Sequence, residues 1–154
     1  MELGETELKV FVEAVTRYFS QTTNEPAVIR SAYLADSSIP RFEYTGLITL
    51  SGCFRGCVHF SAPTDLIKGL LTEWGEKDQS EANLLDAVGE IANTIAGNAR
   101  RHFGKDLEIS VPVNLRGSSE HIKAAVRVRP FVISLNWHKH EAVVIVDLES
   151  TDQK

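Results

Sequence analysis

Three polar residues stand about one helical turn apart in the stretch DAVGEIANTIAGN. Asp86 and Glu90 supply carboxylates, and Asn93 supplies an amide. A carboxylate can pair with a cation, whereas an amide cannot act as a general base at neutral pH but can hold a water through its donor and acceptor. Between Lys77 and Arg100 there is no basic residue, so neither carboxylate has a partner one turn away. These residue types fit either an ordinary solvated helix face or a surface that binds another molecule.

The helical period places these residues on one stripe. At about 100° per residue, Glu90, Asn93 and Gly97 fall within about 40° of Asp86. The opposite side carries the large apolar residues that should enter the core: Leu84, Val88, Ile91 and Ile95. Gly89 and Gly97 each lower helix stability by about 1 kcal/mol relative to alanine. Small residues beside unpaired polar ones favour a surface that a partner approaches closely, although every surface helix has a polar face.

Three helices are expected in the chain. Apolar residues at helical spacing predict a helix from the N-terminal segment to about Gln21, and PTDLIKGLLTEWG predicts a short helix. The helix that carries the stripe should begin near Asp78 or Ser80, with Asp78 and Glu81 as a capping box, and end at Gly104.

The remaining patterns predict strands. Two β-rich runs, Thr45–Leu50 and Cys57–Ser61, flank a glycine-rich turn and predict a hairpin, whereas residues 36–40 predict a loop. Further strands are predicted at Ile109–Leu115, at the alternating residues Ile122–Val128, at Phe131–Trp137 and at Ala142–Leu148. This order of elements predicts an α+β fold, in which helices pack on a largely antiparallel sheet, in a single domain over residues 1–154.

The composition is that of an ordinary globular protein, with 43% hydrophobic and 24% charged residues. A formal net charge of -5 argues mildly against binding to nucleic acid. There is no apolar run of the roughly 20 residues that span a bilayer. The acidic N-terminal sequence lacks the features of a secretory signal, and two cysteines do not make a disulfide scaffold. We therefore expect a cytoplasmic protein.

The stripe and its surroundings resemble the CheC/CheX/FliY phosphatases of bacterial chemotaxis. Their signature is Asp or Ser, three residues, Glu, two residues and Asn, followed later by proline, and this chain has Asp86, Glu90, Asn93 and Pro112. The segments TGLITLSGCFRGCVHFSA, GEIANTIAGNA and ISVPVNLRG are similar to CheX in particular, over roughly residues 44–117. A single Glu–Asn pair is present, as in CheX. The segment ARRHFG departs from the small and apolar residues expected after the motif.

The resemblance implies a CheC-like fold and a phosphatase that acts on the aspartyl phosphate of a CheY-like receiver domain. It implies that Asn93 orients the attacking water and that Glu90 pairs with a lysine of the receiver. Asp86 and Pro112 would then shape the site, and Gly89 and Gly97 would permit close approach. The receiver's own carboxylates would hold Mg²⁺, so the chain needs no cofactor or metal of its own. The resemblance also implies a homodimer that joins sheets, with AVVIV as a possible edge.

Two other interpretations of the function remain open, and a third, based on the cysteines, is not supported. The chain could be a non-catalytic module or adaptor that only binds a receiver. It could bind a metal through His138 and His140, joined by His121 or His59, although WHKHE is more typical of a turn between strands. The CxxxC spacing of Cys53 and Cys57 is not that of a redox pair, so these residues are interpreted as small, half-buried thiols.

Overall fold

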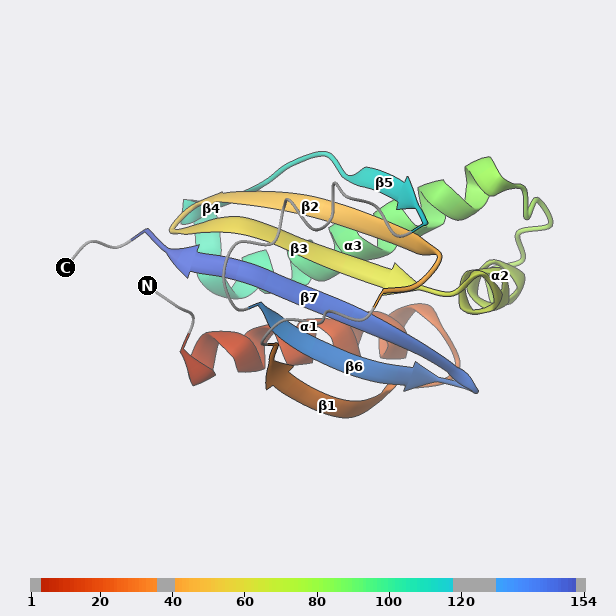
Figure 1. Cartoon of the computed structure of the whole chain (residues 1–154), viewed down its shortest axis with the longest axis horizontal. Helices are drawn as coiled ribbons and strands as arrows, with labels where there is room; N and C mark the ends of the chain where they lie inside the picture. The colour runs from red at the N-terminus through yellow and green to blue at the C-terminus, as the bar shows by residue number, and fades with distance from the viewer. Residues whose placement is uncertain (1–3, 36–40, 118–129, 152–154) are drawn as a thin grey trace.

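The computed structural model describes residues 4–35, 41–117 and 130–151. Within them, seven strands form one antiparallel sheet in the order β1-β6-β7-β3-β2-β4, and β5 also pairs with β2 (Figure 1). The strands are β1 (Val28–Leu34), β2 (Tyr44–Gly52), β3 (Phe54–Ala62), β4 (Leu107–Ile109), β5 (Val113–Arg116), β6 (Phe131–Trp137) and β7 (His140–Ser150). The predicted hairpin is the pair β2–β3.

Three α-helices lie in the described part of the chain: α1 (Glu5–Thr22), α2 (Thr64–Glu73) and α3 (Glu81–Phe103). A short 3-10 turn, η1 (Gly104–Asp106), follows α3. Helices α1 and α3 lie side by side on one face of the sheet, and α2 lies at one end of it (Figure 1). The predicted α+β fold is therefore confirmed.

The core lies between this helix pair and the sheet. Apolar side chains from one face of α1, one face of α3 and the central strands form a continuous buried cluster. Its largest members include Phe11, Phe19, Ile48, Phe60, Ile91 and Ile95. Burial of this apolar surface is the main force that holds α3 on the sheet.

The ends of α3 follow from local chemistry. Ser80 is the N-cap, and its hydroxyl oxygen accepts a hydrogen bond of 3.4 Å from the backbone N–H of Asn83. The predicted capping box is wrong, because the Asp78 carboxylate instead accepts from the backbone N–H of Ser80 at 3.0 Å, before the helix begins. Gly104 ends the helix as predicted, with a φ of 85° that favours glycine.

Two strand predictions differ from the structure. β1 was not predicted, because it is an edge strand in which most residues are exposed and no apolar alternation marks it. The run Ile109–Leu115 divides into β4 and β5, which pair with different parts of β2.

The apolar segment AVVIV belongs to β7, which lies between β6 and β3, so the suggestion that it forms a sheet edge is wrong. The predicted strand at Ile122–Val128 and the loop at residues 36–40 lie outside the described residues.

Close contact between α3 and β2 depends on glycine. A Cβ atom on Gly46 of β2 would collide with the backbone carbonyl of Val88 on α3. Gly89 is also buried on this side of the helix, where a Cβ would collide with the side chain of Asn114 from β5. The absence of side chains at these two positions lets the helix backbone approach the sheet, and this fixes which face of α3 remains outside.

Candidate functional site

The predicted polar stripe lies on the outer face of α3. Asp86 and Glu90 are exposed, and Asn93 and Gly97 are half-buried, while the predicted apolar residues on the opposite side are buried. Within the described residues, the side chains of Asp86, Glu90 and Asn93 make no hydrogen bond or ion pair. Two carboxylates and an amide therefore stand free and close together, which leaves their hydrogen-bonding capacity for another molecule.

A cleft of about 430 Å³ opens beside this stripe, and we call it the acidic cleft. Its walls come from α1, α2 and α3 and the segment between the last two, and its lining includes Tyr18, Leu71, Trp74, Glu76, Asp86 and Glu90. The Trp74 Nε1 atom donates a hydrogen bond of 3.0 Å to the Thr22 carbonyl, which fixes this ring although it is 39% exposed. Burial, together with the nearby Glu90 carboxylate, raises the pKa of Tyr18. The cleft thus combines apolar walls with an acidic rim.

The two glycines of α3 have different surroundings. A Cβ on Gly97 would meet no atom within 4 Å, so this glycine leaves open space on the exposed stripe between Asn93 and the end of the helix. Gly89 faces the sheet instead. Gly89 was expected to let a partner approach, and this expectation is wrong, because Gly89 is buried and the element that lies against it is the sheet.

Pro112 lies at the sheet edge, half-buried in the connection between β4 and β5. β5 contacts α3, and Arg116 at its end forms an ion pair of 2.7 Å with Glu81 at the start of α3. These contacts hold the β4–β5 connection near the helix that bears the stripe. The buried Asn114 Oδ1 atom has no hydrogen-bond partner in the described structure.

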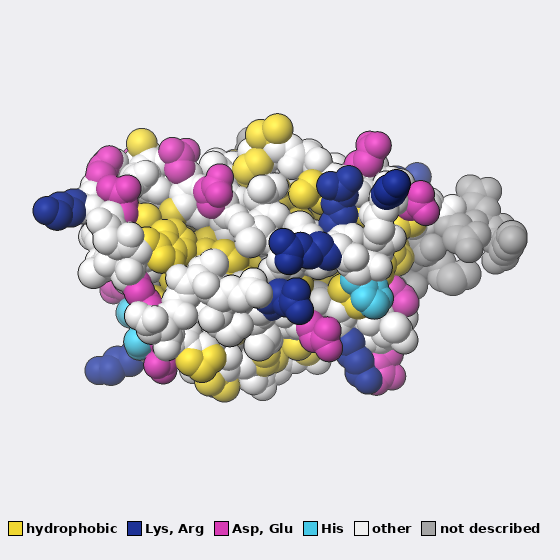
Figure 2. Space-filling view, turned by 180° about the vertical axis from the view of Figure 1, so that it is seen from behind, with side chains coloured by type: hydrophobic (Ala, Val, Ile, Leu, Met, Phe, Trp, Pro, Cys, Tyr) yellow, Lys and Arg dark blue, Asp and Glu magenta, His cyan; other side chains and the backbone are white. Residues whose placement is uncertain are grey.

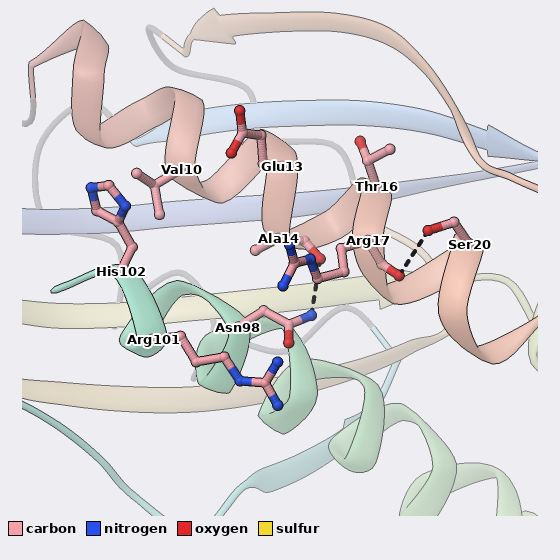
Figure 3. Close-up of a pocket in the computed structure, with 9 residues that line it drawn as sticks. All are labelled: Val10, Glu13, Ala14, Thr16, Arg17, Ser20, Asn98, Arg101 and His102. Atoms are coloured by element: carbon pink, nitrogen blue, oxygen red, sulfur yellow. Dashed lines mark hydrogen bonds between the residues drawn. The ribbon is translucent and has the colours of Figure 1, made fainter. Parts of the chain in front are cut away.

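A second hollow, of about 500 Å³, lies between α1 and the C-terminal half of α3, and we call it the basic groove (Figure 3). Its lining includes Glu13, Arg17, Asn98, Arg101 and His102. The Asn98 amide donates a hydrogen bond of 3.3 Å to the Ala14 carbonyl and so links the two helices. The basic groove and the acidic cleft occupy different parts of the same helical face (Figure 2).

Sequence reasoning did not find either hollow. Each combines residues from helices far apart in the chain, such as Tyr18 with Glu90, or Arg17 with Arg101. The one available signal was the segment ARRHFG, whose cations depart from the pattern expected after the motif.

The histidine pair has little support as a metal site. His138 is exposed at the turn between β6 and β7, with a φ of 54°, and His140 begins β7. No group of three or more potential metal ligands gathers anywhere in the described residues. His121 lies outside those residues.

His59 and Cys57 lie on the face of the sheet opposite α1 and α3. Both are buried, and the Cys57 sulfur lies 3.1 Å from the His59 Nε2 atom. Burial, with a smaller contribution from Arg41, lowers the pKa of His59 from 6.5 to about 4. Cys53 is a half-buried thiol, as the sequence interpretation expected, whereas the Cys57 thiol is buried. His59 is therefore neutral at pH 7, and the side chains of both His59 and Cys57 are buried within the protein.

Comparison with known proteins assigns the fold to one class, the CheC-like proteins. The CheC-like superfamily protein from Shewanella sp. PV-4 has a similar structure, with a TM-score of 0.80 and 16% identity over 96% of this chain and 100% of that one. A family model described as "Chemotaxis phosphatase CheX" matches residues 44–136, so the chain belongs to the CheX family.

Two solved structures of CheX proteins have the same fold. Chemotaxis protein CheX from Vibrio vulnificus has a TM-score of 0.78 and 19% identity, over 94% of this chain and 99% of that one. CheX in the CheX–CheY–BeF₃–Mg²⁺ complex from Borrelia burgdorferi has a TM-score of 0.73 and 15% identity, over 93% and 97%. No curated protein sequence matches the chain. No helix in the described residues combines the length and apolar character needed to cross a membrane.

Proposed function

We propose that this chain is a phosphatase that hydrolyses the aspartyl phosphate of a CheY-like receiver domain. The observation that carries the proposal is the free pair Glu90 and Asn93 on the exposed stripe of a CheX-family helix. The Borrelia burgdorferi complex, in which a protein of the same fold binds CheY with BeF₃ and Mg²⁺, supports a receiver as the partner.

The chemistry needs positioning more than covalent help from the protein. The Asn93 amide would hold a water in line with the phosphorus of the docked receiver. As the water oxygen bonds to phosphorus, the bond between phosphorus and the aspartyl oxygen breaks, and the products are inorganic phosphate and a free aspartate carboxylate. Mg²⁺ held by the receiver's own carboxylates would offset the charge of the phosphoryl group. This chain would supply no metal ligand.

Glu90 would fix the docked position. It stands one turn from Asn93 on the same stripe and has no ion-pair partner within the described residues. A carboxylate in this state can pair with a lysine of the receiver and set the register of the complex. Asp86 and Pro112 would shape the site around this pair, and Gly97 would let the receiver approach α3.

The experiment that tests the proposal replaces Asn93. Asn93→Ala should reduce the accelerated release of phosphate from a CheY-type receiver domain of the same organism, phosphorylated with acetyl phosphate, by about 100-fold or more. The variant should be at least as stable as the wild type, because Asn93 makes no hydrogen bond in the described structure and alanine is the better helix former. Asn136→Ala, which removes an amide from β6, is the matched control and should keep full activity. Full activity in Asn93→Ala would exclude the proposed role.

Glu90→Gln separates docking from chemistry. It keeps the shape of the side chain but removes the charge, so the KM for the phosphorylated receiver should rise by about tenfold, with a smaller fall in kcat. Glu108→Gln removes an exposed carboxylate from β4 and should behave as wild type. Normal binding and turnover in Glu90→Gln would remove Glu90 from the site.

A receiver-binding adaptor is the second candidate function. It shares the fold and the docking face, and differs only in the absence of turnover. A single-turnover assay with phosphorylated receiver in the presence of excess protein separates the two, because an adaptor would leave the intrinsic hydrolysis rate of the receiver unchanged.

A homodimer is also part of the proposal. Strand β1 supports it, since Val28, Tyr33 and Leu34 are exposed large hydrophobic residues on a strand that has a partner on one side only among the described strands. Light scattering measures the mass directly, and a monomer at the concentrations used in the phosphatase assay would exclude a role for the dimer in activity.

A further inference from the structure

The outer face of α1 and α3 is divided by charge. Figure 2 shows carboxylates around an apolar hollow towards one end of this face and a group of cationic side chains nearer the other. The acidic end is the rim of the acidic cleft, with Glu76, Asp86 and Glu90. The cationic part is the basic groove, with Arg17 from α1 and Arg101 from α3.

The two arginines extend towards the same part of the groove. In Figure 3 their guanidinium groups lie on either side of the Asn98 amide, whereas the Glu13 carboxylate points away from them. Among the described residues, neither Arg17 nor Arg101 forms an ion pair. Asn98 is already engaged with the Ala14 carbonyl at 3.3 Å. The donors that remain available in the groove are thus mainly those of the two guanidinium groups, which bind carboxylates well.

Arg101 continues the stripe that carries the motif. The residues Asp86, Glu90, Asn93, Gly97 and Arg101 recur every three or four positions, so they lie along one line of the helix surface. At 1.5 Å per residue, Arg101 lies about 12 Å beyond Asn93 along the axis. Gly97 leaves open space between them. A molecule that covers the motif can therefore extend along this line towards Arg101, since no side chain projects at Gly97.

A helix-stabilising role does not account for both arginines. Cations in the last turn of a helix complement its dipole, and α3 has Arg100, Arg101 and His102 there. Arg100 already binds a backbone carbonyl, because its Nε atom donates to Leu107 at 2.8 Å. Arg17 lies on another helix and faces the same groove. Convergence of two unpaired arginines from different helices indicates a ligand with negative charge.

We propose that the basic groove is a second contact for the phosphorylated receiver, and that it binds an acidic patch of the receiver surface about 12 Å from the phosphorylated aspartate. The inference rests on the proposed function and adds which surface charges the receiver must have. A matching receiver presents cationic groups to the acidic rim and carboxylates to the arginine pair. A receiver that lacks this acidic patch binds more weakly, so charge complementarity selects among the receivers of one cell.

The test is the double variant Arg17→Ala/Arg101→Ala, measured with the CheY-type receiver that the wild type dephosphorylates fastest. We expect the KM to rise by about tenfold, the size expected for two partly exposed charge pairs. The kcat should stay the same, because neither arginine lies at the proposed reacting atoms. The wild-type KM should rise with salt, and the double variant should lose most of this dependence. Arg17→Lys/Arg101→Lys should restore part of the affinity.

Controls separate this inference from the proposed function. Lys139→Ala removes an exposed cation from the turn between β6 and β7 and should leave the KM and its salt dependence unchanged. If Asn93→Ala is inactive but the double arginine variant keeps the wild-type KM and salt dependence, the acidic-patch contact is wrong and the phosphatase assignment stands. An unchanged KM together with a change in mass by light scattering would mean that a second copy of the chain occupies the groove, and would also overturn the inference.

Discussion

Helix α3 carries a glycine on each of its two faces, and the two glycines have opposite surroundings. Gly89 lies against the sheet, where an added Cβ would collide with Asn114, while Gly97 lies on the outer stripe, where it would meet nothing within 4 Å. Packing explains the inner glycine completely. It does not explain the outer one, which lowers helix stability without any gain inside the protein. A residue that no internal contact explains is a sign of an external partner.

The same contrast holds for polar groups. On the far face of the sheet, His59 and Cys57 are buried and lie within 3.1 Å of each other. On the outer stripe, the side chains of Glu90 and Asn93 are without partners in the described structure. We attribute stability to the buried groups and the proposed activity to the stripe, and three predictions test that division.

The largest expected effect concerns the pH dependence of stability. His59 has a pKa of about 4 in the folded protein but 6.5 as its ordinary value, so between these values only the unfolded chain binds the proton. Its contribution is fully present above pH 6.5 and is lost as the pH falls towards 4, by about 3 kcal/mol in total. Urea unfolding at a series of pH values measures this directly.

Two variants make the test specific. His59→Leu should flatten the pH dependence and keep phosphatase activity at pH 8, whereas His138→Gln, which removes an exposed histidine, should follow the wild type. An unchanged slope in His59→Leu would show that this buried histidine does not control acid stability. Loss of activity in a folded His59→Leu protein would break the division between buried and exposed groups.

A somewhat smaller effect is expected at the contact between α3 and the sheet. Gly46→Ala places a Cβ against the backbone carbonyl of Val88, and a backbone atom cannot swing aside. We expect a loss of about 2 kcal/mol in the free energy of unfolding. Gly89→Ala should cost less, because the end of the Asn114 side chain can move. Equal stability of Gly46→Ala and the wild type in urea would mean that α3 shifts freely on β2.

The sequence predicted those features that depend on local pattern. The apolar period gave α1 and α3, the glycine-rich turn gave the β2–β3 pair, and Gly104 marked the end of α3. β1 was not predicted, because most of its residues are exposed and its sequence shows no apolar alternation. The different roles of Gly89 and Gly97 were not predicted either. They depend on whether Asn114 of β5 lies against the glycine, and residue spacing along one helix does not reveal that.

The site shows the same limit. The helical period of about 100° per residue placed Asp86, Glu90 and Asn93 on an outer stripe of α3, and the structure confirms that placement. The acidic cleft and the basic groove could not be predicted, since they arise where α1 packs beside α3 and bring Tyr18 or Arg17 against residues about 70 to 85 positions later in the chain. Family resemblance supplied the roles of individual residues, and these remain predictions.

The smallest expected effect, a gain of stability, comes from Gly97→Ala. The added methyl group meets no neighbour, and alanine is the better helix former, so the free energy of unfolding should rise by about 1 kcal/mol. Binding of the receiver in its beryllofluoride form should weaken, because the methyl group stands where the partner approaches.

Gly97→Leu should weaken binding further while its stability stays at or above that of the wild type. If Gly97→Leu binds the receiver as tightly as the wild type, the partner does not cover this part of α3, and the continuous contact from Asn93 to Arg101 is excluded as well. Stability and binding that move in opposite directions would show that the outer glycine is retained for the partner and not for the fold.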